Sequence, residues 1–278
     1  MKQIGKLTLA LGSLLMLAGC GQSLTTGKTT YKQTGMVAVI KGTAKGTQQV
    51  RYQAPAATGT VKVSGDSFVV SVPVAPKAQT VTLKAGDLTH RVTVQAAKSL
   101  GTYSAVAKAY NQAVVAMALP AETQAQLKQA QSVDISKLSP AEKLAAAQQQ
   151  QALAAAMATA QKQTKVQQLP ASVTGLKQVL KSAAGTVRLN VQAGQLMGIT
   201  EIVPIKAMKT KKLQAQFATQ FGLLANAVGA DAKKVGTAFQ KATSDKDSSS
   251  TTIDTITSHG VKFDVGFSTT ALYIYITK

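Results

Sequence analysis

The chain has 278 residues, a formal net charge of +20 at pH 7, one cysteine, six tyrosines, six phenylalanines and no tryptophan. This length allows one or two domains with real hydrophobic cores, and a single cysteine excludes a disulfide framework within the chain. The low aromatic content of 4% argues against a carbohydrate-stacking platform or a base-stacking nucleic-acid groove, because both need exposed rings.

The first nineteen residues have the three parts of a secretory signal. Lys2 and Lys6 precede an apolar run over 7–17, and small residues follow immediately before Cys20. The run is too short and too interrupted for a transmembrane helix, which needs about 20 apolar residues. An ordinary secretory signal also ends in small residues, but it does not require a cysteine after them. The sequence therefore predicts a signal peptide over 1–19.

The string Leu17-Ala18-Gly19-Cys20 resembles the lipobox of bacterial surface lipoproteins of the Gram-positive type. The resemblance implies a diacylglyceryl group on the thiol of Cys20, cleavage before that residue, and a mature chain anchored at the outer face of the cell membrane. Two acyl chains suit this role because each buried methylene contributes about 0.8 kcal/mol and one chain anchors only marginally. Because the chain has one cysteine, lipidation would also leave no free thiol for any other reaction.

Residues 20–34 are predicted to be the lipidated cysteine and a flexible tether, because Thr, Gly, Lys and Gln dominate them and leave little to bury.

Over 35–98 apolar residues alternate with polar or small ones, and turn signals such as Gly65-Asp66 separate the alternating runs. Such spacing predicts a β-sandwich. The string over 65–73, followed by that over 79–83, resembles the small Ig-like modules of bacterial surface proteins, which implies a spacer or a binding module.

Residues 99–168 change to alanine, glutamine and a helical period. One apolar stripe runs from Tyr103 to Met117 with spacings of three and four. Ser139 followed by Pro140 and, at the third position, Glu142 predicts the start of a long helix with a capping box. Two interpretations stay open: a coiled-coil or partner-binding helix, or an alanine-rich hairpin packed on the following domain. The thin apolar stripe favours the hairpin.

Residues 169–278 indicate an α+β domain, since alternating strands, then helices, then strands follow one another. Leu176 to Leu180 fits a strand or a short helix. The expected fold is thus multidomain, mainly β plus α+β: an Ig-like β-sandwich, an alanine-rich helical connector, and a C-terminal sheet covered by helices. Its expected strands are 187–191, 199–205, 253–256, 261–267 and 272–276, and its helices lie at 213–228 and after Asp231.

No catalytic, metal or cofactor site is expected. His90 and His259 have no partners at metal-ligand spacing, so each is interpreted as a strand or turn residue. Glu201, Asp254 and Asp264 come from strands that could adjoin, yet cross-strand pairing with lysine is favoured over a pair of catalytic acids.

Tyr273 and Tyr275 are the candidate partner-binding residues. They occupy the same face of the last predicted strand, opposite Leu272, Ile274 and Ile276. If helices cover only one face of the sheet, the two rings lie on its open face and could contact a ligand or protein. The alternative is that they shield lysine stems or pack beneath the alanine-rich helices.

The expected function is that of a lipid-anchored extracytoplasmic protein with a non-enzymatic binding or structural role in the cell envelope. Removal of Lys2 and Lys6 with the signal takes 2 from +20 and leaves +18, which favours anionic wall polymers or an unidentified envelope protein as partners besides the membrane. A solvated surface is the favoured account of the dispersed lysines, and affinity for the anionic envelope is the functional alternative. Nucleic acid is not expected outside the cell. The alternatives are a ligand-binding lipoprotein of an importer and an envelope enzyme.

Overall fold

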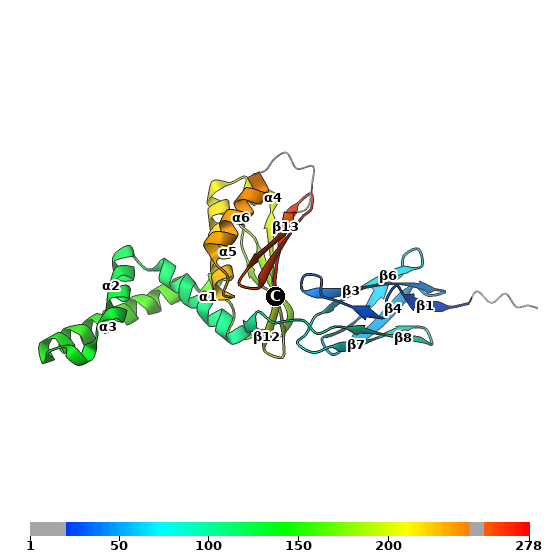
Figure 1. Cartoon of the computed structure of the whole chain (residues 1–278), viewed down its shortest axis with the longest axis horizontal. Helices are drawn as coiled ribbons and strands as arrows, with labels where there is room; N and C mark the ends of the chain where they lie inside the picture. Colours follow the sequence, from blue (N-terminus) through cyan, green and yellow to red (C-terminus); the bar gives the residue numbers. More distant parts are fainter. Residues whose placement is uncertain (1–20, 245–252) are drawn as a thin grey trace, which may run out of the picture.

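The structure is a computed structural model that describes residues 21–244 and 253–278. The predicted signal peptide and Cys20 therefore lie outside the described residues. Figure 1 shows an elongated molecule in which a β-sandwich, a helix-covered sheet and a helical arm follow one another along the long axis. The predicted fold class, multidomain and mainly β with an α+β part, is confirmed.

The sandwich consists of two sheets that enclose one apolar core. Alternation of apolar and polar residues places one face of each strand inside, and the core includes Ile40, Val70, Leu83 and Val92. The first sheet has the order β1 (Ser23–Thr26), β3 (Val37–Lys45), β6 (Ser67–Pro73). The second has the order β2 (Thr30–Tyr31), β8 (Leu88–Val94), β7 (Gln79–Ala85), β4 (Gln49–Ala54), β5 (Ala57–Lys62).

The prediction of a flexible tether over 20–34 is wrong for most of that segment. β1 pairs antiparallel with β3, and β2 pairs parallel with β8. Leu24 and Tyr31 belong to the sandwich core, and the Tyr31 hydroxyl donates to the carbonyl oxygen of Lys41 at 3.3 Å. The segment forms strands because its β-branched threonines suit an extended backbone. Each short strand also has one buried side chain that anchors it to the core, and a neighbouring strand supplies its backbone hydrogen bonds.

Gly42 gives a direct test of this strand pairing. A Cβ built on Gly42 would lie 2.3 Å from the carbonyl oxygen of Thr25 and 2.5 Å from Cζ of Phe68. We expect Gly42→Ala to lower the free energy of unfolding by about 2–3 kcal/mol, because backbone or core side chains must shift. Urea unfolding followed by circular dichroism measures the change. Gly27→Ala is the matched control, since a Cβ there meets nothing within 4 Å; equal losses in the two variants would contradict the pairing.

The C-terminal part contains an antiparallel sheet with helices on one face. Leu176 to Leu180 is resolved as a strand, not a helix. The sheet order is β10 (Gly175–Lys181), β11 (Thr186–Gln192), β12 (Gln195–Pro204), β15 (Ala271–Thr277), β14 (Val261–Phe267), β13 (Ile253–Ser258), and β9 (Gly101–Thr102) pairs with the end of β12. The helices are α1 (Tyr103–Ala118), α4 (Ile205–Met208), α5 (Lys211–Ala227) and α6 (Ala232–Ser244).

The core of this part lies between the helices and one face of the sheet. The predicted stripe of α1 is buried here through Tyr103, Val106 and Tyr110, so α1 belongs to the C-terminal unit although it precedes the arm in sequence. An aromatic cluster joins α5 to the sheet: the ring centroids of Phe221 and Phe263 are 5.7 Å apart with a nearly perpendicular arrangement. All of these contacts fill one face of the sheet.

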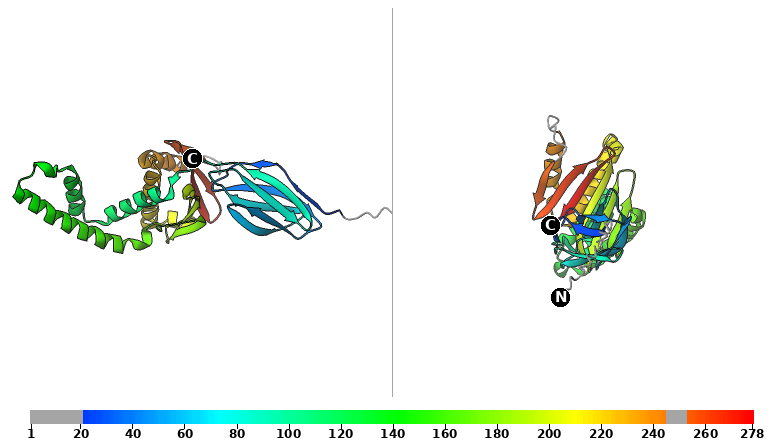
Figure 2. Two further views of the ribbon diagram at one scale, coloured as in Figure 1. Left: turned by 90° about the horizontal axis from the view of Figure 1, so that it is seen from below. Right: turned by 90° about the vertical axis from the view of Figure 1, so that its right-hand side faces the viewer.

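The alanine-rich segment only partly packs on the following domain, so that prediction needs correction. α2 (Ala121–Ser132) and α3 (Pro140–Gln163) form an arm that projects from the body, as Figure 1 and the left view of Figure 2 show. The predicted capping box is confirmed, because the Ser139 side chain accepts from the N–H of Glu142 and the Glu142 carboxylate accepts from the N–H of Ser139. The arm projects because its apolar residues suffice only for a small core of their own, which includes Leu119 and Ala160.

Candidate functional site

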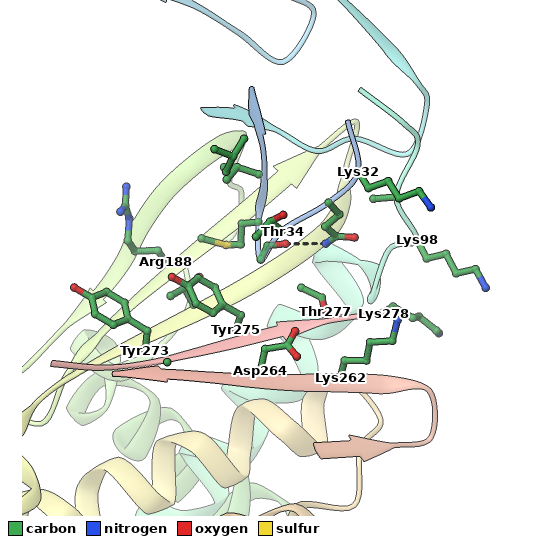
Figure 3. A pocket seen from close by; sticks show the side chains of 18 of the residues that line it. Lys32, Thr34, Lys98, Arg188, Lys262, Asp264, Tyr273, Tyr275, Thr277 and Lys278 are labelled. Carbon is green, nitrogen blue, oxygen red and sulfur yellow. Dashed lines mark hydrogen bonds between the residues drawn. The ribbon is translucent and has the colours of Figure 1, made fainter. Parts of the chain in front are cut away.

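The face of the C-terminal sheet that helices leave open forms a cleft with the near end of the sandwich. The cleft has a volume of about 1130 Å³. Residues 32–37 and 95–98 come from the sandwich side, and side chains of β11, β12, β14 and β15 form the other wall. Figure 3 shows Tyr273 and Tyr275 on β15, below the turn that carries Thr34.

Strand alternation in β15 explains how the two tyrosines reach this cleft. Leu272, Ile274 and Ile276 are at most 1% exposed and belong to the core under the helices. Successive side chains of a strand point to opposite faces, so Tyr273 and Tyr275 project from the uncovered face and line the cleft. The sequence-based expectation for their position is correct; their role in binding stays a prediction.

The register of four strands places a polar row across the floor of the cleft. Arg188 on β11 pairs with Thr200 on β12, Thr200 pairs with Tyr275 on β15, and Tyr275 pairs with Asp264 on β14. All four residues line the cleft. Neighbouring strands lie about 4.8 Å apart, so a guanidinium, a hydroxyl, a phenol and a carboxylate follow one another in a line perpendicular to the strands.

The two tyrosine rings stand side by side with nearly the same orientation. Their centroids are 6.5 Å apart and their planes differ by 12°. Tyr275 is fixed by the sandwich, because Gly35 lies against its ring: a Cβ on Gly35 would be 2.8 Å from Cδ1 of Tyr275, and the φ of Gly35 is +58°. Burial raises the pKa of Tyr275, Tyr273 raises it further, and the nearby Arg188 lowers it.

The cleft has a strong excess of positive charge. Five cationic side chains and one carboxylate, that of Asp264, line it. Within residues 21–244 and 253–278, none of these cations forms an ion pair; the pairs found there are Lys137–Asp134 and Lys234–Asp231. The field in the cleft is therefore attractive for anions. The five cations are Lys32, Lys98, Arg188, Lys262 and Lys278.

A buried contact beside the cleft fixes the sandwich on the sheet. The side-chain amide of Asn190, which is fully buried, donates to the carbonyl oxygens of Met36 at 3.0 Å and Val74 at 2.8 Å. Its own oxygen accepts from Gln192 at 2.9 Å. Met197 of β12 is fully buried and belongs to the sandwich core. The walls of the cleft are thus held by polar and apolar contacts together.

The hydroxyl of Thr200 on the cleft floor has no hydrogen-bond partner among the described residues. Thr200 is 2% exposed, and a buried hydroxyl without a partner costs free energy. A group that enters the cleft and reaches this hydroxyl would relieve that cost.

The remaining candidates from the sequence do not come together. Glu201 lies on the helix-covered face of β12, where it pairs with Ile274, while Asp264 lies on the open face and accepts a hydrogen bond from Thr255. Asp254 is exposed on β13. The predicted pairing of these acids with lysine is wrong, because none of the three has an ion pair with a described residue.

Both histidines have structural hydrogen bonds. His90 Nε2 lies 2.9 Å from Oγ1 of Thr26, and His259 Nδ1 lies 2.9 Å from the carbonyl oxygen of Gly229. His259 has a φ of +49° and Gly260 one of +77°, as the predicted hairpin turn requires. In the part of the chain that the structure describes, no three His, Cys, Asp or Glu residues gather as metal ligands.

Sequence reasoning missed Arg188, Thr200 and Asn190. The alternation of Val187, Leu189 and Val191 could have identified the opposite face of β11 as polar. Nothing in the sequence pairs that face with the sandwich, because the partners of Asn190 are backbone carbonyls 154 and 116 residues away.

Comparison with known proteins shows no family. No family model and no curated protein matches the chain. Among solved structures, an FMN-binding beta-glucuronidase from Facaelibacterium prausnitzii L2-6 is similar over 27% of this chain and 12% of that protein, with 11% identity and a TM-score of 0.23. This likeness carries no argument about function. Among the described residues, no helix has the length and apolar character needed to span a membrane.

Proposed function

We propose that this protein is a lipid-anchored extracytoplasmic protein of the cell envelope with a non-enzymatic binding role, and that the cleft is its binding site. The observation that carries the proposal is the cleft lining. Two tyrosine rings of nearly one orientation lie on a sheet face that the helices leave open, and five cations without ion pairs to described residues line the same cleft, from the sheet and from the sandwich side. A surface with a structural role alone gains nothing from like charges around aromatic rings.

The anchor is supported by the lipobox and by the position of the first strand. β1 begins at Ser23, so only Gly21 and Gln22 separate it from Cys20. Three residues of extended chain span about 10 Å. A lipid on Cys20 would therefore hold the sandwich against the headgroups, and the C-terminal sheet lies at the opposite end of the sandwich (Figure 1).

No observation on the structure specifically favours either of the two alternative functions, an importer lipoprotein or an envelope enzyme. Importer lipoproteins are usually built from two α/β lobes, whereas every strand pair in the C-terminal sheet is antiparallel. An envelope enzyme would need a constellation of reacting groups, and Glu201 and Asp264 lie on opposite faces of the sheet.

Cys20→Ala tests the anchored role. In a bacterium that processes lipoproteins, we expect the membrane-bound fraction of the full chain to fall by about tenfold, because one or no acyl chain cannot hold it. Cell fractionation with immunoblotting measures the change, and a wash at high salt removes protein held by charge alone. Globomycin, which blocks lipoprotein signal cleavage, should leave the unprocessed precursor.

Gln22→Ala is the matched control, since it changes a neighbouring polar residue and leaves the lipobox intact. It should fractionate like the unchanged protein. Retention of Cys20→Ala on salt-washed membranes at the level of this control would refute the lipid anchor.

A further inference from the structure

The cleft lining specifies a ligand class, and this inference rests on the proposed function. We infer that the cleft binds an anionic glycan, a chain of sugar rings that carries carboxylate or phosphate groups. Three features of the lining lead to this ligand: a flat aromatic pair, cations around it, and a hydrogen-bonding row that contains a carboxylate.

The aromatic pair suits ring-shaped groups. Tyr273 and Tyr275 stand side by side in nearly one orientation, and Gly35 fixes the second of them. Two rings with one orientation offer a platform on which the apolar faces of consecutive sugar rings can pack. The low aromatic content of the whole chain argued against such a platform, but a platform needs only two rings, and the fold brings two into one cleft.

The cations require that the ligand be anionic. Lys262 and Arg188 lie on opposite sides of β15, on β14 and β11. Lys32 and Lys98 line the sandwich side of the cleft, with side chains that extend away from the two rings (Figure 3). Positive groups on several sides of the rings fit a ligand with repeated negative charges. A neutral glycan would leave them unpaired.

Asp264 distinguishes a glycan from a simple polyanion. This carboxylate lies beside Tyr275 on the cleft floor, where it would repel a ligand that is negative along its whole length. A carboxylate accepts hydrogen bonds from hydroxyl groups, which sugar rings supply. The buried Thr200 hydroxyl, which lacks a partner among the described residues, lies on the other side of Tyr275 from Asp264.

An acidic peptide fits the cleft less well. An extended peptide gains most from adding a strand to a free sheet edge, but β11, β12, β15 and β14 are all interior strands of the sheet. The cleft offers the face of the sheet, and a face binds side groups and rings. We therefore take the acidic peptide as an outcome to be tested.

The test measures binding of defined polymers to the full chain purified in a nonionic detergent. Oligogalacturonate carries rings and carboxylates, phosphorylated dextran carries rings and phosphates, unmodified dextran has rings alone, and polyphosphate has charge alone. Calorimetry at 150 mM salt should show saturable binding of at least one charged glycan, about tenfold or more tighter than dextran or polyphosphate. The tighter of the two charged glycans identifies the anion.

Three variants test the named residues. Tyr273→Ala should weaken binding of the charged glycan about tenfold, and Tyr273→Phe should restore most of it because the ring remains. Lys262→Gln should weaken binding several-fold, with a smaller salt dependence. Lys143→Gln on the exposed arm removes the same charge outside the cleft and should leave the affinity unchanged. Thermal unfolding of each variant shows that the fold is intact.

Asp264→Ala separates sugar recognition from attraction by charge. Loss of a negative charge should tighten the binding of any polyanion held by charge alone, whereas loss of an acceptor for sugar hydroxyls should weaken the charged glycan several-fold. Tighter binding by this variant would refute the inference. So would equal affinity for polyphosphate, polyglutamate or oligo-dT and the charged glycans. If the glycans fail while Cys20→Ala still releases the protein, the ligand class is wrong and the anchored role stands.

Discussion

Raising the pH from 4.5 to 8 should destabilise this protein, because a carboxyl group is buried in the core of its C-terminal part without a partner. Glu201 is 2% exposed, and neither of its carboxyl oxygens has a hydrogen bond to a described residue. Burial raises its pKa from 4.5 to about 8. The carboxyl group is therefore neutral in the folded protein at a pH where it is ionised in the unfolded chain.

The sign of the effect follows from proton binding. Between pH 4.5 and 8 the folded state holds a proton on Glu201 that the unfolded state has lost, so stability falls as the pH rises. Its contribution is fully present below the unfolded pKa and is lost as the pH approaches the folded pKa. Each pKa unit corresponds to about 1.4 kcal/mol, so the whole window amounts to about 5 kcal/mol.

Glu201→Leu should remove this dependence and stabilise the protein by several kcal/mol at pH 8, because an apolar side chain of similar size replaces a buried carboxyl group that has no hydrogen-bond partner among the described residues and that ionises only when the protein unfolds or the pH nears 8. Urea unfolding at a series of pH values from 4.5 to 8.5 measures both effects. Glu122→Leu, at an exposed position in α2, is the control and should keep the slope of the unchanged protein.

The carboxylates with lowered pKa values do not obscure the window. The pKa values of Asp134, Glu142 and Asp231 are lowered: hydrogen bonds with Ser136 and Ser139 are the largest cause for the first two, and the backbone N–H of Lys234 for the third. Groups with lowered pKa values lose their contribution as the pH falls below their unfolded values, which lie at 3.8 to 4.5. A flat stability between pH 5 and 8 in the unchanged protein would contradict the assignment to Glu201.

Asn190→Ala should produce the second large effect, a loss of about 2–4 kcal/mol in the free energy of unfolding. The substitution removes the hydrogen bonds to the carbonyls of Met36 and Val74, and a buried acceptor left without a partner costs about 1–3 kcal/mol. Because these bonds join the sandwich to the sheet, calorimetry should show the thermal transition of the unchanged protein separate into two.

Gln192→Ala is the matched control for this substitution. Gln192 is half-buried and donates to the Asn190 oxygen, so its removal leaves both contacts between the sandwich and the sheet in place. It should cost about 1 kcal/mol and keep the transition undivided. A single transition with unchanged midpoint in Asn190→Ala would show that the two parts are not coupled through this side chain.

Much of the fold was predictable because its elements have strong local patterns. The alternation in Val261-Phe263-Val265 and Leu272-Ile274-Ile276 predicts strands with one buried face, and the placement of Tyr273 and Tyr275 on the other face follows directly. The start of α3 was equally clear, since Ser139 and Glu142 form the predicted capping box. These features depend on residues close together in sequence.

The parts that were not predictable depend on partners far away in sequence. β1 carries one buried apolar residue, Leu24, among polar neighbours, and only its pairing with β3 distinguishes it from a linker. Likewise, no local pattern says that the sandwich covers part of the open sheet face. The row of Arg188, Thr200 and Asp264 became a site only when the strand register was known.

The pairing of β1 with β3 also determines how the molecule bears mechanical load. A pull on the N-terminal end of β1 acts at Ser23, which pairs with Lys45, the last residue of β3. The rest of the protein is held at the opposite end of β3, where Met36 and Val74 meet Asn190. Force therefore runs along the strands and loads all four β1–β3 pairs in shear, at once instead of one after another, so that the short strand resists being pulled out of the sheet.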